Sequence, residues 1–192
     1  YSLLVVDTGG THADLTEDYS AVPSEMKSVA HLFDAEVLRE VSMDVYLEKI
    51  PYIRKQLGDR AVLRGLHFIQ ENERVISEVT ALESGDFQSF LRLVETSGNS
   101  SFKWLQNIYT TKNIKEQGVS LALALTEKYL TEIGEGSCRV HGGGFAGTIQ
   151  VFLPDNNVEE YIKEMEQIFG EDSVQVLKIR SIGTTHLNSI VS

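Results

Sequence analysis

The chain has 192 residues, of which 42% are hydrophobic and 23% are charged, so it is long enough to bury one sizeable hydrophobic core. The formal net charge of −11 argues against nucleic acid as a partner, because polyanion binding requires a basic face and the Lys and Arg residues do not cluster into one. The longest apolar run, 119–125, is too short to span a bilayer, which predicts a cytoplasmic protein without membrane contact.

The first two thirds of the chain predict one strand followed by helices. A short apolar run over 2–6, closed by a turn, is typical of a buried strand. Because the chain opens directly on this strand with Tyr1, we expect it to be the excised part of a longer protein. A helix or a loop fits 102–109 equally well. Apolar residues at helical spacing predict helices, in chain order, over 23–41, 43–50, 59–83, 86–94 and 115–131. The second of these is expected to end near Pro51, the third to stop at Gly85, and the fourth to break at 95–101.

In the last third of the chain, the spacing of hydrophobic residues changes from one typical of helices to one that includes strands. Runs rich in β-branched residues predict strands over 137–140, 147–153 and 174–179, and an amphipathic helix is expected over 158–169. With the first strand added, these elements predict a four-stranded sheet covered on one face by helices. One cysteine, Cys138, excludes an internal disulfide, and the five scattered histidines show no metal-ligand spacing, so no metal site is expected.

Four glycines lie within the stretch RVHGGGFAGTIQVF, between two predicted strands. Glycine reaches positive φ without steric cost and allows another backbone or a ligand to come close. Two interpretations follow from the spacing alone: a wide hairpin turn, or a loop whose N–H groups approach a phosphate.

Two further features have alternative interpretations. Asp7-Thr8-Gly9-Gly10-Thr11 is similar to a phosphate-contacting turn of sugar kinases in the actin-like ATPase superfamily, although a second phosphate loop of that kind is missing. Tyr19 is expected in a polar loop between the first strand and the first long helix, where a tyrosine serves either packing or binding.

Three segments together resemble the GHMP kinases, and galactokinase in particular. RVHGGGFAGTIQVFLP is similar to the third motif of that family in its Gly-Gly-Gly-Phe-x-Gly form. VVDTGGTHADLTEDYSAVPSE is similar in placement to the stretch that follows the domain junction, where a loop tyrosine contacts the sugar. ENERVISEVTALESGDFQSFLRLVETSGNSS resembles an arginine-bearing helix, a Gly-Asp turn and a helix that ends in a serine-rich loop.

The resemblance covers nearly the whole chain but only the second half of such an enzyme. It implies a single domain, 1–192, of ferredoxin-like α+β type with an antiparallel four-stranded sheet, which is the C-terminal half of a two-domain kinase. No catalytic residue is expected here, because the family's catalytic residues and its ATP loop lie in the N-terminal half. That N-terminal kinase domain would be the partner of this chain and would bind most of the ATP and Mg²⁺.

The same resemblance assigns site residues and a reaction. Tyr19 would contact the sugar, and Gly142, Gly143, Gly144, Phe145 and Gly147 would lie against the nucleotide phosphate loop. The family loop usually has glycine where this chain has Ala146, and alanine fits there only at negative φ. The parent enzyme would transfer the γ-phosphate of ATP to the 1-hydroxyl of galactose or a related hexose, and the isolated fragment would be inactive. The alternatives are a catalytically silent sugar- and ATP-binding regulator on the same fold, and a fragment of an actin-like sugar kinase.

Overall fold

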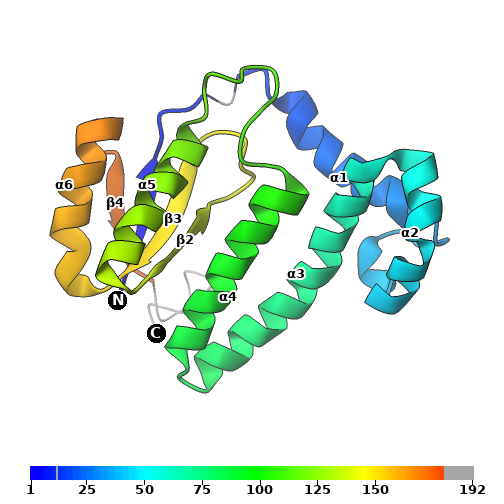
Figure 1. Ribbon diagram of the computed structural model, residues 1–192, viewed down its shortest axis with the longest axis horizontal. Helices are drawn as coiled ribbons and strands as arrows, with labels where there is room; N and C mark the ends of the chain where they lie inside the picture. The colour runs from blue at the N-terminus through cyan, green and yellow to red at the C-terminus, as the bar shows by residue number, and fades with distance from the viewer. Residues whose placement is uncertain (12, 180–192) are drawn as a thin grey trace, which may run out of the picture.

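A computed structural model describes residues 1–11 and 13–179 and shows an α+β fold (Figure 1). Its sheet has four antiparallel strands in the order β2-β3-β1-β4. The strands are β1 (Ser2–Asp7), β2 (Ser137–Val140), β3 (Thr148–Leu153) and β4 (Val174–Leu177). The predicted number of strands and their antiparallel arrangement are therefore confirmed in the described part of the chain.

Two helices cover one face of the sheet, as the sequence predicts (Figure 1). They are α5 (Gly118–Ile133) and α6 (Val158–Phe169), the latter with the predicted bounds. Alternate residues of the strands, including Leu4 and Ile149, point toward these helices and form the main core with Ala122 and Tyr161. Burial of these apolar side chains holds the sheet and the two helices together.

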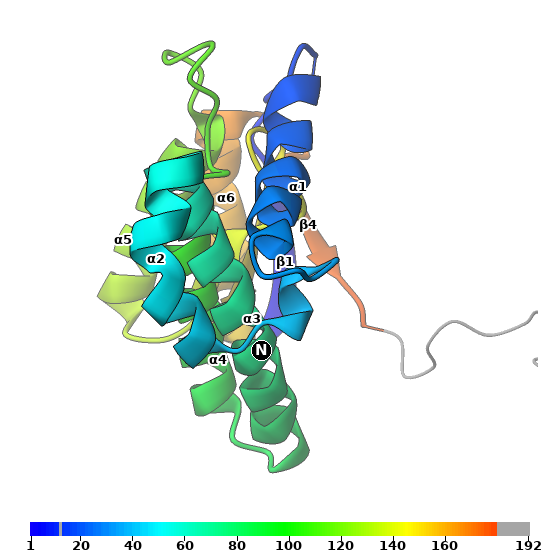
Figure 2. The same cartoon turned by 90° about the vertical axis from the view of Figure 1, so that its right-hand side faces the viewer.

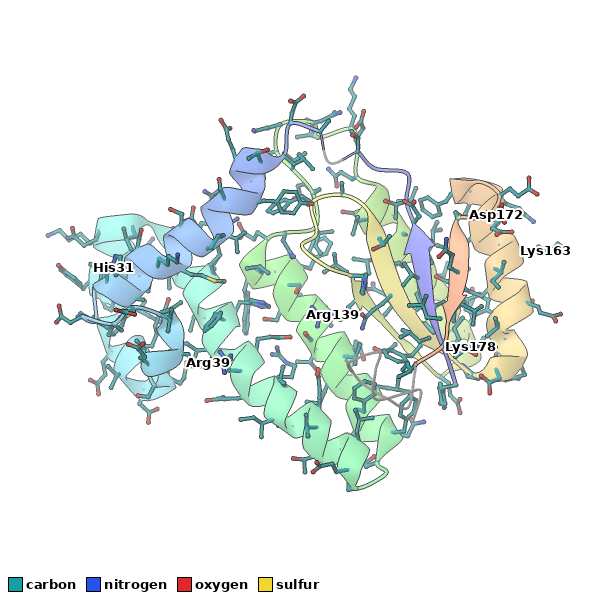
Figure 3. All side chains as sticks on the ribbon, turned by 180° about the vertical axis from the view of Figure 1, so that it is seen from behind. His31, Arg39, Arg139, Lys163, Asp172 and Lys178 are labelled. Carbon is teal, nitrogen blue, oxygen red and sulfur yellow. The ribbon has the colours of Figure 1, made fainter. Side chains whose placement is uncertain are left out.

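Helix α4 (Phe87–Ser100) adds packing on the opposite face of the sheet. Leu3 and Phe152 are register partners on that face, and they form a small core with Leu91 and Val94 of α4. Asp86 caps α4, because its side chain accepts a hydrogen bond from Ser89 N at 3.0 Å. Arg139 of β2 lies between the sheet and the α3–α4 hairpin (Figure 3).

A second core joins the helices that lie beside the sheet (Figure 2). Helix α3 (Asp59–Glu83) has the predicted bounds, and it packs against α1 (Thr16–His31) and α2 (Met43–Leu57). Buried apolar residues of these three helices and of a short 3₁₀ helix, η1 (Leu38–Glu40), form this core.

The predicted bounds of the first helix were wrong at both ends. Helix α1 begins before Pro23, at Thr16, where Glu17 and Asp18 lie in the first turn and are favoured by the positive end of the helix dipole. It ends at His31 and not at Val41, because a turn follows in which Asp34 takes a φ of 56°.

Two predicted helix breaks do not occur. Pro51 lies inside α2, where it removes one backbone hydrogen bond on a largely exposed turn. Gly98 lies inside α4, and a Cβ at that position would lie 2.8 Å from Arg139 Cβ. Glycine is therefore needed there for close approach of the helix to β2, and not to end the helix. The chain continues into a one-turn π-helix, η2 (Ser101–Leu105), so the undecided segment 102–109 is helical only at its start.

Candidate functional site

Three loops meet at one end of the molecule, and the glycine loop (residues 142–147) is the central one (Figure 1). It connects β2 to β3. Gly142 and Gly144 have φ values of +71° and +79°, while Gly143 between them is outside the positive region. Such alternation points successive N–H groups into one concavity, which is a known anion-binding geometry. The N–H groups of Gly142 and Gly143 have no acceptor among the described residues.

Asn107 holds the glycine loop from one side. Its carbonyl oxygen accepts a hydrogen bond from Phe145 N at 2.5 Å, and its Nδ2 donates to Gly143 O at 3.1 Å. The approach is so close that a Cβ on Gly144 would lie 1.9 Å from Asn107 O. Asn107 is 3% exposed. No sequence pattern points to this residue, because a single Asn in an irregular segment is common.

Tyr19 holds the loop from the other side, and its predicted place in a loop was wrong, because it lies in the first turn of α1. The Tyr19 hydroxyl donates to Gly144 O at 2.7 Å, across 125 positions of sequence. A Cβ on Gly143 would lie 2.8 Å from the Tyr19 ring. Partial burial raises the pKa of Tyr19, so the hydroxyl keeps its proton and remains a donor at neutral pH. The structure thus brings the two predicted site elements together.

Phe145 has a φ of +61°, an unusual conformation for a large side chain. Its ring is 6% exposed and packs edge-on against Tyr19, with ring centroids 5.3 Å apart. Leu15, Ala146 and Val22 complete this small apolar cluster. Phe145 therefore belongs to the internal packing of this domain. Ala146 does not have positive φ, so the alanine that replaces the family glycine is accommodated without strain.

The Asp7–Thr11 turn lies directly beside the glycine loop. Gly147 O accepts hydrogen bonds from Thr8 N at 2.9 Å and from Thr8 Oγ1 at 2.7 Å. The Asp7 carboxylate accepts a hydrogen bond from Gly9 N at 2.9 Å, which closes the turn. The turn therefore supports the neighbouring loop, and the sheet around it is antiparallel throughout the described residues. These contacts give the actin-like interpretation no support.

A hollow of ≈ 830 Å³ adjoins the loop between this turn and the segment before α5. Lys112 on its rim donates to Glu17 Oε2 at 2.8 Å, and this hydrogen bond raises the pKa of Lys112 and lowers that of Glu17. Thr110 Oγ1 donates to Asp18 Oδ2 at 2.8 Å. The segment before α5 is thereby tied to the first turn of α1, which also carries Tyr19.

An ion pair between Arg64 and Glu25 connects the two segments that carry Tyr19 and Asn107. Arg64 of α3 is 2% exposed, and its Nη1 donates to Glu25 Oε2 of α1 at 3.0 Å. Its Nε donates to Leu105 O at 3.1 Å, at the end of the π-helix that precedes Asn107. Burial lowers the pKa of Arg64, and Glu25 opposes that effect. Arg64 therefore joins the helix that bears Tyr19 to the segment that bears Asn107.

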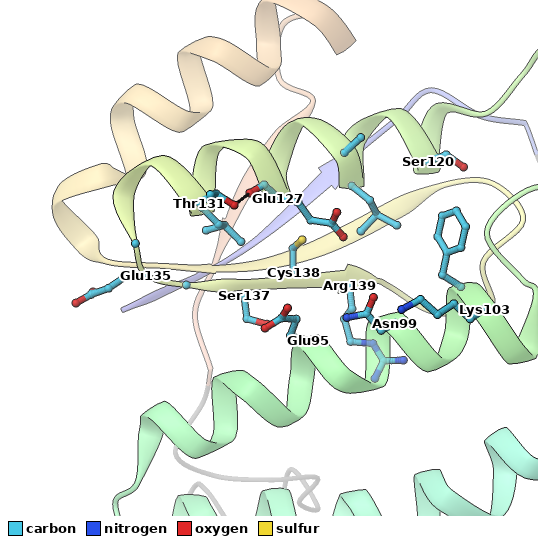
Figure 4. Close-up of a pocket in the computed structure, with 17 residues that line it drawn as sticks. Glu95, Asn99, Lys103, Ser120, Glu127, Thr131, Glu135, Ser137, Cys138 and Arg139 are labelled. Carbon is cyan, nitrogen blue, oxygen red and sulfur yellow. Dashed lines mark hydrogen bonds between the residues drawn. The ribbon is translucent and has the colours of Figure 1, made fainter.

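A second hollow, of ≈ 690 Å³, lies along the edge strand β2 between α4 and α5 (Figure 4). Glu95 of α4 and Glu127 of α5 lie on its two sides, with Cys138 of β2 between them. Burial raises the pKa of the Cys138 thiol, so this cysteine is not a nucleophile. None of the predicted site residues lines this hollow. Within 1–11 and 13–179, no group of three or more His, Cys, Asp or Glu side chains could hold a metal ion, and no helix is long and apolar enough to cross a membrane.

Comparison with known proteins connects this fold to galactokinases. The structure matches the crystal structure of Lactococcus lactis galactokinase complexed with galactose with a TM-score of 0.71 over 92% of this chain and 44% of that chain, at 18% identity. The α+β fold with its antiparallel sheet is therefore that of a galactokinase. No protein-family model matches the chain.

The sequence relatives agree. The chain is 30% identical over 162 residues to galactokinase from Mannheimia succiniciproducens, covering 84% of this chain and 40% of that protein. It is 28% identical over 160 residues to galactokinase from Actinobacillus pleuropneumoniae and 27% identical over 171 residues to that from Thermotoga neapolitana. These matches cover 83% and 89% of this chain, and 39% and 44% of the relatives. The chain is homologous to galactokinases and is a partial galactokinase-like domain, since it spans about 40% of the length of these relatives.

Proposed function

We propose that the chain is the C-terminal half of an ATP-dependent sugar kinase of galactokinase type. The parent would transfer the γ-phosphate of ATP to the 1-hydroxyl of galactose or a related hexose. The observation that carries this proposal is the hydrogen bond between Tyr19 and Gly144, because it joins the two elements for which the family resemblance predicts substrate contacts.

In this proposal the glycine loop stabilises negative charge and closes the cleft. Phosphoryl transfer depends mostly on positioning and on stabilisation of charge spread over the phosphoryl oxygens. The N–H groups of Gly142 and Gly143 fit an anionic oxygen, and a Cβ built on Gly142 meets no atom within 4 Å. Exposed backbone without side chains also allows a phosphate-binding loop of another domain to lie against it.

The remaining assignments follow from the same proposal. Tyr19 is half-buried and its hydroxyl holds Gly144, so the residue for which the family resemblance predicts a sugar contact lies directly against the glycine loop. The N-terminal kinase domain of the parent would supply the catalytic residues and most of the contacts to ATP and Mg²⁺. ATP supplies the phosphoryl group, and the chain's own part is to orient its loop and to exclude water from the cleft.

The test is ADP release by the full-length parent with ATP, Mg²⁺ and a panel of hexoses, beside the same assay on the 192-residue chain. We expect turnover with galactose or a related hexose by the parent and none by the chain. Turnover by the chain alone would contradict the assignment. If the parent releases no ADP but still binds sugar in calorimetry, the alternative function, a catalytically silent sugar- and ATP-binding regulator, would be favoured.

A matched pair of glycine substitutions links any activity to the loop. Gly142 and Gly134 have similar positive φ, +71° and +76°, and a Cβ on either meets no atom within 4 Å. The left-handed φ therefore strains a substitution to a similar extent at both positions. In the parent, Gly142→Val should lower kcat, while Gly134→Val, in the turn after α5, should not. Equal effects of the two substitutions would remove the loop from the proposed site.

A further inference from the structure

We infer that Asn107 is the positioning residue of the glycine loop, which deepens the proposed function and rests on it. Asn107 has no role in the sequence-based prediction. It contacts three consecutive residues of the loop: it bonds Gly143 and Phe145 and lies against Gly144. Thr8 also makes two hydrogen bonds to the loop, but both go to Gly147 O at its end, whereas the two bonds of Asn107 reach Gly143 and Phe145 in its middle.

Two of these contacts are with loop residues that have positive φ, Gly144 and Phe145. Phe145 has a φ of +61°, and the hydrogen bond from its N–H to Asn107 O holds it in that region. Gly144 has a φ of +79° and is in contact with the same carbonyl oxygen. Such conformations persist only where the surroundings determine them, and they concentrate at functional sites. Asn107 therefore maintains the backbone of the loop whose Gly142 and Gly143 N–H groups have no acceptor among the described residues.

The local fold fixes Asn107 in turn. The π-helix η2 ends at Leu105, and the next residue, Gln106, has a left-handed φ of 58° and donates its N–H to Ser101 O at 2.8 Å. Arg64 holds the preceding carbonyl, Leu105 O. These two hydrogen bonds set the direction in which the chain leaves the helix toward Asn107. The Oδ1 atom of Asn107 is buried without a hydrogen-bond partner in the described residues. A buried polar atom without a partner is costly, so the side chain is retained for the bond that Nδ2 makes to the loop.

The first test uses the 192-residue chain and measures loop order by backbone amide NMR relaxation. Asn107→Ala removes the Nδ2 bond to Gly143 O and keeps the backbone bond to Phe145 N, so it tests the side chain's share of the positioning. It should lower the order parameters of residues 142–144 from about 0.85 to below about 0.6. Asn72→Ala is the matched control, because Asn72 Nδ2 also donates to a backbone carbonyl, Phe68 O at 2.8 Å, but in α3 and away from the loop. Asn107→Ser is a milder variant if Asn107→Ala does not fold. An unchanged loop in a folded Asn107 variant would overturn the inference.

The second test uses the parent kinase and separates positioning from stability. Asn107→Ala should lower kcat by about tenfold or more with KM for the sugar changed less than about twofold, since a displaced catalytic loop costs rate. Asn72→Ala should leave both constants as they are. A disordered loop with normal kcat would overturn the positioning role. If the parent has no kinase activity, the proposed function fails, and the NMR result still decides whether Asn107 orders the loop.

Discussion

Substitution of alanine for Gly144, compared with Gly142, isolates the contact between the glycine loop and Asn107. Both glycines have similar positive φ, +79° and +71°, so alanine brings the same backbone strain and the same loss of unfolded-state freedom at each position. They differ in surroundings. A Cβ on Gly144 would lie 1.9 Å from Asn107 O and 2.7 Å from Asn107 Nδ2, whereas one on Gly142 meets no atom within 4 Å.

The magnitudes follow from these distances. Left-handed strain costs an alanine about 1–2 kcal/mol at either position. At Gly144 the Asn107 backbone must also move away, which breaks its hydrogen bond to Phe145 N at about 1 kcal/mol and adds overpacking of at least about 1 kcal/mol. Gly144→Ala should therefore lower the free energy of unfolding by about 3–4 kcal/mol, and Gly142→Ala by about 1–2 kcal/mol.

Urea denaturation of the 192-residue chain measures both variants. With a slope of about 2 kcal/mol per M, the difference of about 2 kcal/mol corresponds to a midpoint about 1 M lower for Gly144→Ala than for Gly142→Ala. The slope itself should stay constant, because the unfolded state is the same. Coincident midpoints for the two variants would refute the reasoning, since they would mean that Asn107 does not press on the loop.

Three further substitutions test the supports of the site by the same assay. Tyr19→Phe removes the hydroxyl bound to Gly144 O and keeps the ring, so the free energy of unfolding should fall by about 1 kcal/mol. Tyr109→Phe is the control, and an equal loss in that variant would mean that the Tyr19 bond makes no specific contribution to stability. Glu25→Ala leaves Arg64 as an unpaired buried charge and should cost about 3–5 kcal/mol, whereas Arg60→Ala, which loses only an exposed pair, should cost less than about 1 kcal/mol. The pKa of His67 is lowered from 6.5 to about 4, chiefly by burial, with Glu71 opposing the shift and Arg74 and Arg139 adding to it. The unfolded chain therefore takes up that proton first, so stability present above pH 6.5 is lost as the pH falls toward 4, and His67→Gln should show a smaller loss between pH 7 and pH 5.

Strong periodicity made several elements predictable from the sequence. Helices α3 and α6 have the predicted bounds because each has an unbroken apolar face and an end marked by glycine, Gly85 or Gly170. Strand β2 was also correct to the residue. In these segments the local preference and the tertiary packing agree, so the sequence pattern suffices.

Three of the errors share one cause, which is that Pro23, Pro51 and Gly98 were interpreted as helix boundaries. Pro23 and Pro51 each remove one backbone hydrogen bond, and the packing of α1 and α2 against α3 outweighs that loss. Gly98 provides close contact with Arg139 across 41 positions of sequence, which local pattern does not report. Long-range packing therefore decided each of these cases.

Asn107 marks the limit of what the sequence could reveal about the site. The glycine loop and Tyr19 were found because they match a family pattern, while Asn107 acts through its backbone carbonyl and one amide group. A carbonyl oxygen is present at every residue, so its role depends only on where the fold places it. That placement comes from the left-handed Gln106 and from Arg64, which lies more than 40 positions earlier.

The three consecutive glycines of the loop are required for different physical reasons. Gly144 leaves no space for a side chain because Asn107 occupies it, and Gly143 lies against the Tyr19 ring. Both glycines therefore serve the internal packing of this domain. Gly142 alone has open space where a Cβ would lie, together with a positive φ. Substitutions at Gly144 should therefore act mainly by lowering the free energy of unfolding of the domain. Substitutions at Gly142 should act mainly on the contacts that a ligand or another domain makes with the exposed side of the loop.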